Sequence, residues 1–226
     1  MTVRATSRRW AELLGQVGDV LSDVPAFLTA PLYRRWHLRW GATAAEVSAS
    51  FPGDALVPGA QFRATRAIRI EAPPEAVWPW LVQVGCSRAG WYSNDLLDNL
   101  ARPSATMIVP ELQVLDVGQW VPMSPTPTER TALKVHSFAA NEWLLWTKAD
   151  STWSWMLTPT DNGTRLVTRI RARYDWRHPL TAALSVLLME FGDFAMIRRM
   201  LRGIKVRAEA SRGRDHAVCQ DPEHPV

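Results

Sequence analysis

Three neighbouring side chains are the best suited in this sequence to binding or proton-transfer chemistry. Trp91, Tyr92 and Asp95 bring two aromatic rings, a phenol hydroxyl and a carboxylate together in one short stretch. Such a group could stand at the mouth of a pocket, with Tyr92 and Asp95 binding the polar head of a ligand or acting as acid and base. Asp95 also stands near the start of an expected short helix, where a carboxylate has a structural role, so both interpretations stay open.

A further carboxylate, Glu190, lies in a long apolar stretch near the C-terminus. If Glu190 reached into a cavity, burial would raise its pKa and suit it to general acid–base work. The alternative is a place on the flank of a helix with the carboxylate in water. Asp95 and Asp98 could share a helix face, but two carboxylates without a histidine do not indicate a metal site. The catalytic candidates are therefore Tyr92, Asp95 and Glu190, and no metal is predicted.

Aromatic residues suggest an apolar binding surface. Trp153 and Trp155 alternate with Ser154, so both indole rings should point to the same side of one strand. Phe191 and Phe194 lie in the expected helix opposite that strand. These rings could line a ligand cavity or fill an ordinary core. The predicted ligand-binding residues are Trp91, Tyr92, Asp95, Trp153, Trp155, Phe191 and Phe194.

Several large functional classes lack their sequence motifs here. Neither a P-loop nor a GxGxxG motif is present, and the five histidines show no metal or triad spacing, so we predict no cofactor. An arginine stripe on the last expected strand could attract nucleic acid or anionic lipid. Such a stripe on an outer sheet face is usually solvated and no nucleic-acid motif accompanies it, so we predict no nucleic-acid partner. The stripe consists of Arg165, Arg169, Arg171 and Arg173.

Cysteine usage and charge give only broad expectations. Cys86 and Cys219 are far apart and neither belongs to a CxxC pair, so no disulfide framework is implied and a cytoplasmic location is expected. The net charge of +4 is compatible with anionic partners without identifying one. The longest apolar run near the N-terminus is broken by Pro25 and Pro31, which argues against a signal peptide or membrane span there.

A long helix over residues 179–212 should organise the domain. The stretch has no proline after Pro179 and is rich in good helix formers. Its apolar residues form two stripes about 100° apart around the helix, so the helix either bends near Gly192 or crosses two surfaces. The first stripe contains Leu180, Leu184, Leu187, Leu188, Phe191 and Ala195, and the second contains Phe194, Ile197, Leu201, Ile204 and Ala208.

From Gln61 onward the apolar pattern changes to the period of two that is typical of strands. A helix beginning at Pro73-Pro74 and a short helix at 94–100 follow the first strand. Turn chemistry then separates five more strand candidates, at 114–123, 131–138, 143–148, 152–159 and 164–174. One sheet face is apolar, and we expect the long helix, which starts near Leu180, to cover that face while the basic face is solvated.

Local motifs add a resemblance to a known family. Residues 68–78 read Ile-Arg-Ile-Glu-Ala-Pro-Pro-Glu-Ala-Val-Trp, residues 90–93 read Gly-Trp-Tyr-Ser, and Ser-Thr-Trp stands at 151–153. With residues 198–205 and the element order, they resemble the helix-grip fold of the START/Bet v 1-like superfamily, also called SRPBCC or polyketide-cyclase-like proteins, in a bacterial branch of unknown activity. The resemblance implies an α+β fold with a curved antiparallel sheet around a long C-terminal helix. It implies little about activity, because the superfamily includes lipid carriers, hormone receptors and cyclases.

The resemblance also divides the chain. We predict a helical N-terminal extension at 1–60, the helix-grip domain at 61–212 and a frayed tail at 213–226. In the extension, residues 7–24 have amphipathic spacing, and an arginine-rich stretch around Trp36 follows. This arm, residues 7–40, either folds onto the domain or contacts a membrane surface or partner. Thr43 and Glu46 have capping-box spacing, which predicts a short helix.

Three functions are consistent with these features. The first is binding or carriage of a hydrophobic small molecule, such as a lipid, polyketide or aromatic compound, and the missing catalytic constellation favours it. The second is a cyclase- or dehydratase-like enzyme that uses Tyr92, Asp95 or Glu190. The third is a membrane-peripheral protein attached through residues 7–40. No residue pattern indicates an oligomeric state.

Overall fold

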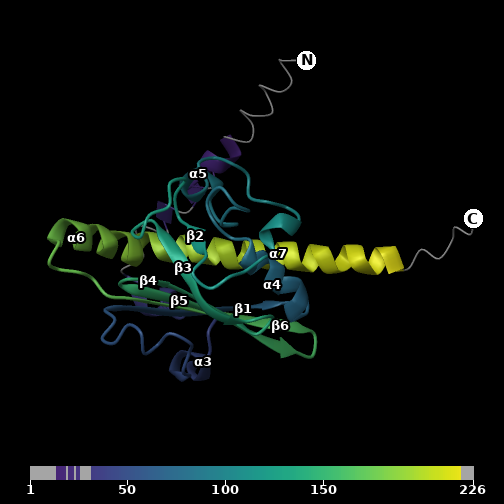
Figure 1. Ribbon diagram of the computed structural model, residues 1–226, viewed down its shortest axis with the longest axis horizontal. Helices are drawn as coiled ribbons and strands as arrows, with labels where there is room; N and C mark the ends of the chain where they lie inside the picture. Colours follow the sequence, from purple (N-terminus) through teal and green to yellow (C-terminus); the bar gives the residue numbers. More distant parts are fainter. Residues whose placement is uncertain (1–13, 19, 23, 26–31, 220–226) are drawn as a thin grey trace, which may run out of the picture.

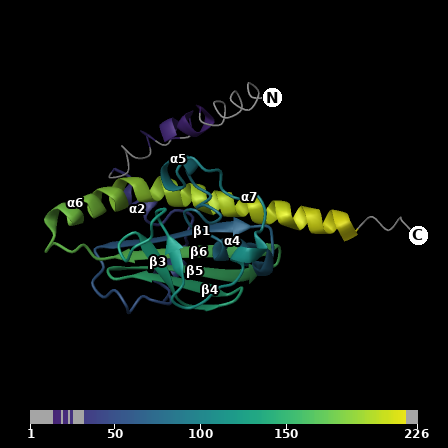
Figure 2. The same cartoon turned by 45° about the horizontal axis from the view of Figure 1, so that its top comes forward.

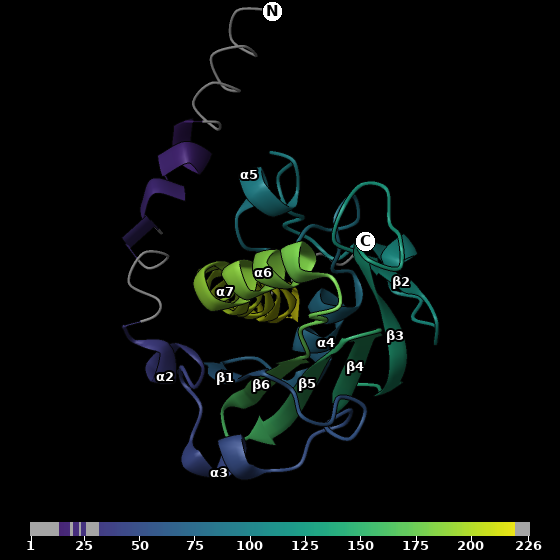
Figure 3. The ribbon, with the colours of Figure 1, turned by 90° about the vertical axis from the view of Figure 1, so that its left-hand side faces the viewer.

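The computed structural model describes residues 14–18, 20–22, 24–25 and 32–219, with side chains as far as Ser211. A long C-terminal helix lies across one face of an antiparallel sheet (Figure 1). The segment before the first strand covers the opposite face of the sheet (Figure 3). The predicted α+β helix-grip fold is therefore confirmed.

The sheet has six strands in the order β1-β6-β5-β4-β3-β2, and every neighbouring pair is antiparallel. Five strands lie close to their predicted positions. The strand predicted at 114–123 is shorter, because a turn from Asp116 to Gln119 precedes it. The strands are β1 (Phe62–Ile70), β2 (Trp120–Pro122), β3 (Ala132–Ala139), β4 (Trp143–Lys148), β5 (Ser151–Thr160) and β6 (Gly163–Ala172).

The C-terminal helix has three parts: α6 (Pro179–Leu187), a π-helical segment η2 (Leu188–Gly192) and α7 (Asp193–Cys219). A π turn holds about one residue more than an α turn, and one residue turns a helix by about 100°. This insertion accounts for the predicted shift between the two apolar stripes. The helix also continues to Cys219, past the predicted end at Arg212, so the tail expected at 213–226 is helical over its described part.

The two apolar stripes have different surroundings. In the second stripe, Phe194, Ile197, Leu201, Ile204 and Ala208 are all buried. The helix starts near Leu180 as predicted, but the leucines of the first stripe are exposed, so this first part of the helix does not pack on the sheet. The gripped part is α7, and α6 projects past the end of the sheet (Figures 1 and 2). The exposed fractions are 88% for Leu180, 53% for Leu184, 54% for Leu187 and 58% for Leu188.

The convex face of the sheet is covered by the segment that leads into β1. Helix α3 (Ala44–Ser48) begins with the predicted capping box between Thr43 and Glu46. The following turn places the Pro52 carbonyl against β5, where it accepts a hydrogen bond from Ser154 Oγ at 2.5 Å. The prediction of a solvated basic face is therefore wrong at its centre, since the side chain of Arg169 has no exposed surface.

Helix α2 (Arg34–His37) and the turn after it cover the free edge of β1. The backbone amides of Thr65 and Ala67 donate hydrogen bonds to the carbonyls of Leu38 and Trp40. Pairing with a loop blunts an edge strand that could otherwise pair with another chain. Residues 34–57 thus contact the edge and the convex face of the sheet and form a separate layer of the domain.

The remaining opening is closed by helices α4 (Pro74–Val82) and α5 (Asp95–Asp98), with a short 3₁₀ helix η1 (Pro110–Leu112) between them and β2. Pro79 lies inside α4, which continues through it to Val82. The loop before α5 packs closely on α7, because a side chain at Gly203 would meet the Tyr92 carbonyl oxygen at 2.3 Å. The position of this loop fixes one wall of the candidate site.

Candidate functional site

A cavity of about 340 Å³ lies between the C-terminal helix, the α5 region and strands β5 and β6. Most of the surface of its wall is apolar, and the charged side chains of Asp98, Lys148, Asp150, Arg173 and Asp193 also line it. Small-molecule sites typically have this composition and start at about 300 Å³. The cavity lies where α6 leaves the sheet, so the change of helix face at η2 opens it.

The helical wall comes from η2 and the first turns of α7. Leu188, Met189, Met196 and Met200 line the cavity there, and Gly192 adds a stretch of wall without a side chain. Methionine is unbranched and polarisable, so it adapts to irregular apolar ligands. The spacing of Met189, Met196 and Met200 along one helix is a signal that the sequence contained and that our sequence analysis did not use.

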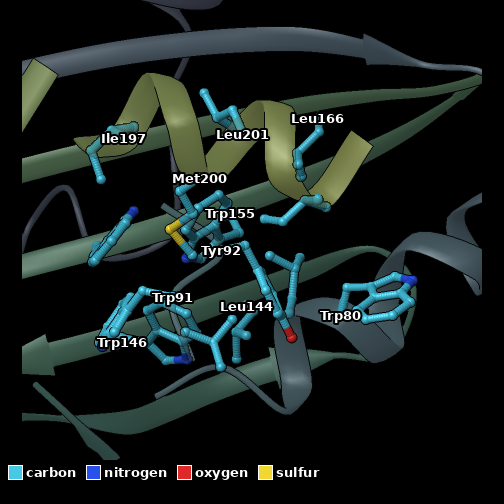
Figure 4. Packing of buried hydrophobic residues seen from close by; sticks show 14 of the residues in the cluster. Trp80, Trp91, Tyr92, Leu144, Trp146, Trp155, Leu166, Ile197, Met200 and Leu201 are labelled. Atoms are coloured by element: carbon cyan, nitrogen blue, oxygen red, sulfur yellow. The ribbon is translucent and has the colours of Figure 1, made fainter. Parts of the chain in front are cut away.

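The sheet wall is a cluster of tryptophans. The indole rings of Trp91 and Trp153 line the cavity and stack with centroids 5.7 Å apart and planes 7° apart. Trp146 meets both rings edge-on and lies close to Trp91 in Figure 4. The Trp153 indole N–H donates to Thr168 Oγ1 at 2.7 Å, which fixes that ring against β6. A rigid, flat aromatic wall results.

Asp98 is the carboxylate that borders the cavity from α5. Burial raises its pKa to about 6, although the Ser93 hydroxyl and the Asn94 backbone amide donate hydrogen bonds to it and oppose that rise. A carboxyl group with such a pKa changes protonation close to neutral pH. Only the helical spacing of Asp98 with Asp95 was visible in the sequence, whereas the raised pKa results from burial in the folded chain.

A buried ion pair between Asp193, the first residue of α7, and Arg66 forms part of the cavity surroundings. Asp193 lines the cavity, and its Oδ2 atom lies 2.6 Å from the Arg66 guanidinium on β1. Burial raises the pKa of Asp193, whereas Arg66 acts to lower it. Tyr174 lies nearby in the wall, and burial raises its pKa to about 12. Its buried hydroxyl makes no hydrogen bond to the described residues and could therefore receive one from a ligand.

Tyr92 and Asp95 lie outside the cavity wall. Tyr92 is buried, its hydroxyl accepts a hydrogen bond from the Gln83 amide at 3.0 Å, and burial raises its pKa to about 12. Asp95 accepts hydrogen bonds from the Ser104 amide at 3.0 Å and hydroxyl at 2.5 Å. Both residues hold the loop around α5 in shape, which supports the structural interpretation of Asp95.

Four other predicted residues also lie away from the cavity. Trp155 is completely buried behind Trp153, and the two rings stack at 5.2 Å. Phe194 points to α2, where it stacks on His37 at 4.0 Å. Phe191 is half-buried and is not part of the wall. The carboxylate of Glu190 lies 2.6 Å from the guanidinium of Arg34 on the flank of the helix. Of the predicted ligand-binding residues, the cavity brings together Trp91 and Trp153.

Several solved structures are similar to this chain at low sequence identity. No protein-family model matches the chain, and no curated protein matches it. A solved polyketide-cyclase-like protein from Corynebacterium glutamicum is 15% identical, with a TM-score of 0.42 over 74% of this chain and 100% of that one. A protein from Staphylococcus saprophyticus is 12% identical, with a TM-score of 0.39 over 66% of this chain and 93% of that one. The di-domain ARO/CYC StfQ of the steffimycin biosynthetic pathway is 14% identical, with a TM-score of 0.38 over 67% of this chain and 52% of that one.

At these identities and TM-scores, the likeness assigns no activity to this chain. The element order and the cavity define the class of protein: a helix-grip protein with a largely apolar cavity that opens to solvent. Among the residues with described side chains, no group of three or more His, Cys, Asp or Glu is placed to hold a metal ion. The function must therefore be argued from the cavity itself.

Proposed function

We propose that this protein binds an apolar small molecule in the cavity between the sheet and the C-terminal helix. The observation that carries the proposal is the cavity of about 340 Å³ walled by stacked Trp91 and Trp153 on one side and by methionines on the other. A recess of this size, lined mainly by apolar and aromatic side chains, is typical of a small-molecule site.

The wall chemistry indicates the ligand class. Flat indole rings favour a planar or ring-containing apolar body, and the flexible methionine side favours an irregular one. Among the polar groups of the wall, Asp98 and Tyr174 each have a buried oxygen atom that could exchange a hydrogen bond with a ligand. We therefore propose a neutral compound with an apolar body and a hydroxyl or carbonyl group at one end, such as a lipid or polyketide.

Filling the cavity tests this proposal. Met196 is half-buried in the wall, so Met196→Trp should occupy the space and weaken binding of the neutral dye Nile red at least tenfold, measured by fluorescence titration. Val206→Trp is the matched control, because Val206 is exposed on the same helix and does not line the cavity. Nile red binding of equal strength to wild type and Met196→Trp would refute the proposal. Trp153→Ala enlarges the cavity and should alter the affinity or the stoichiometry of dye binding. It provides a second test of the proposal if Met196→Trp does not fold.

A second candidate function is acid–base catalysis on a polyketide-like substrate, as in a cyclase or dehydratase. The observation that favours it is Asp98, a carboxyl group in the cavity wall whose pKa is raised to about 6. A group of this kind can donate and accept protons near neutral pH. In that case Asp98→Asn would retain dye binding and lose turnover. Tyr92 is a poor general base by comparison, because its raised pKa keeps the phenol neutral.

A further inference from the structure

The outward side of α6 is an unusual surface for a helix in a folded domain. Leu180, Leu184, Leu187 and Leu188, here named the leucine face, are each more than half exposed. The whole helix is long and apolar enough to span a membrane by composition, yet only 22% of its most apolar window is buried. A contiguous apolar patch of this kind typically marks an interaction site.

The residues around the leucine face give it a positive, interfacial character. Trp176 is 58% exposed just before α6, and exposed tryptophan favours the boundary between lipid and water. Arg173 and Arg177 are exposed beside it. Of the nearby acidic groups, the Glu190 carboxylate is paired with the guanidinium of Arg34 at 2.6 Å, and Asp175 Oδ2 lies 3.1 Å from the imidazole Nδ1 of His178.

We propose that the leucine face docks this protein on the surface of an anionic lipid bilayer. Leucines on one side of a helix, with arginines and a tryptophan at its start, match the composition of helices that lie in the membrane interface. Each arginine near an anionic surface adds to the attraction between the protein and the bilayer. A second copy of the chain would bring like charges together at the same place, which makes a bilayer the better partner.

The position of the leucine face agrees with docking and not with insertion across a bilayer. Ala182 on the opposite side of α6 is buried, and Ser185 faces the cavity. The continuation of the helix, α7, is held on the sheet. The protein therefore offers one side of α6 to lipid while the other side stays in contact with the domain.

The leucine face also reaches the cavity. Leu188 belongs to both, since it is exposed and lines the wall. Two other wall residues, Leu97 and Met123, are also about half exposed, at 52% and 49%. Docking through α6 would bring this apolar rim to the bilayer, so an apolar ligand could pass between lipid and cavity without crossing water. This last step depends on the proposed ligand binding, whereas the docking itself does not.

Vesicle co-sedimentation of the full chain tests docking. The vesicles are phosphatidylcholine alone or with about a quarter phosphatidylglycerol, and we expect binding to be much stronger with the anionic lipid. Leu184→Gln/Leu187→Gln should lower the partition coefficient at least tenfold, because each buried leucine contributes strongly to membrane affinity. The matched control is Val114→Gln/Val206→Gln, which changes two exposed apolar residues elsewhere and should bind as wild type does.

Other attachment modes give different results. In the N-terminal arm, the described side chains of Leu14 and Leu21 are also exposed, so Leu14→Gln/Leu21→Gln tests attachment through that arm. The docking proposal is overturned if only the arm variant loses vesicle binding, or if wild type ignores both vesicle types. It is likewise overturned if sedimentation equilibrium shows a dimer that the leucine variant abolishes while vesicle binding is unchanged. Nile red binding by the leucine variant separates docking from ligand binding: loss of vesicle binding with dye binding retained supports docking alone.

Discussion

At the scale of single residues, Asp98 is the group whose chemistry the fold changes most usefully. Burial raises its pKa to about 6, while hydrogen bonds from Ser93 and Asn94 keep the charged form accessible. Asp193 is also buried in the cavity wall, and burial raises its pKa too, although the Arg66 guanidinium at 2.6 Å acts to lower it and so opposes its protonation. Asp98 is therefore the cavity carboxyl group that we expect to titrate near neutral pH.

This assignment predicts a pH dependence of ligand binding. A neutral apolar ligand removes water from Asp98 and so favours its protonated form. Affinity for Nile red should then be highest below pH 6 and fall several-fold as the pH rises from 6 to 8, because deprotonation of Asp98 must be reversed on binding. The measurement is a fluorescence titration at each pH. Asp98→Asn should bind the dye with an affinity that is flat over this range, and an unchanged slope in that variant would remove Asp98 from the explanation.

The raised pKa of Asp98 also makes the stability of the folded protein depend on pH. Because the folded-state pKa of about 6 lies above the ordinary value of 3.8, the protonated form of Asp98 is favoured by folding. Its contribution is complete below about pH 3.8 and is lost as the pH rises through about 6. A melting curve taken at each pH therefore accompanies the binding titration, so that loss of affinity is not mistaken for loss of fold.

At the scale of elements, the contact between α7 and the α5 region sets the shape of the cavity. Gly203 lets the helix approach the backbone of Tyr92, and the Arg207 guanidinium lies 4.7 Å from the centroid of the Tyr92 ring. Tyr92 itself has a positive φ of 56°, so the loop is held in a conformation that isolated residues rarely adopt. Close packing here supports the loop that carries Trp91 and Asp98.

Gly203→Ala should therefore destabilise the protein even though alanine favours helices. The new methyl group would lie 2.3 Å from a backbone oxygen, which cannot move aside as a side-chain end would. We expect a loss of roughly 1–3 kcal/mol, against a gain of about 1 kcal/mol in helix propensity. Urea unfolding measures the difference, with the exposed Val206→Ala on the same helix as a control that should be near neutral. A more stable Gly203→Ala would contradict the close approach.

At the scale of the whole molecule, the segment before β1 is part of the packed structure. The Arg169 guanidinium donates hydrogen bonds to the carbonyls of Glu46, Val47 and Ala49 at 2.8, 2.9 and 2.7 Å. It also pairs with Asp54 at 2.8 Å. This one side chain from β6 thus fastens the α3 layer to the convex face of the sheet.

Loss of that side chain should loosen the layer. Arg169→Met leaves Asp54 and several carbonyl groups without their partner, at a cost of about 3–5 kcal/mol in unfolding free energy. Arg69→Met is the control, because Arg69 is exposed on the neighbouring strand and should cost well under 1 kcal/mol. Chemical denaturation followed by fluorescence compares the two. Equal stability of both variants would mean that the α3 layer contributes little to folding.

Local patterns in the sequence determined most of the secondary structure. Period-two alternation located the strands, because a sheet with one apolar face requires that alternation. The shift between the two apolar stripes near Gly192 predicted a change of helix face, and the π segment Leu188–Gly192 is where it occurs. The capping box at Thr43 and Glu46 was equally local, since both of its hydrogen bonds lie within one helical turn.

Only the tertiary structure decided which side chains reach the cavity. Trp153 and Trp155 point to the same side of β5, but Trp153 lines the cavity and Trp155 is closed off behind it. Sequence periodicity reports the side of a strand or helix on which a residue lies, not the distance to the element opposite. For the same reason, sequence periodicity did not predict that the leucines of α6 are exposed or that Arg169 is buried. Their environments depend on where α6 leaves the sheet and on which segment covers the convex face, and both are set by contacts between residues far apart in the chain.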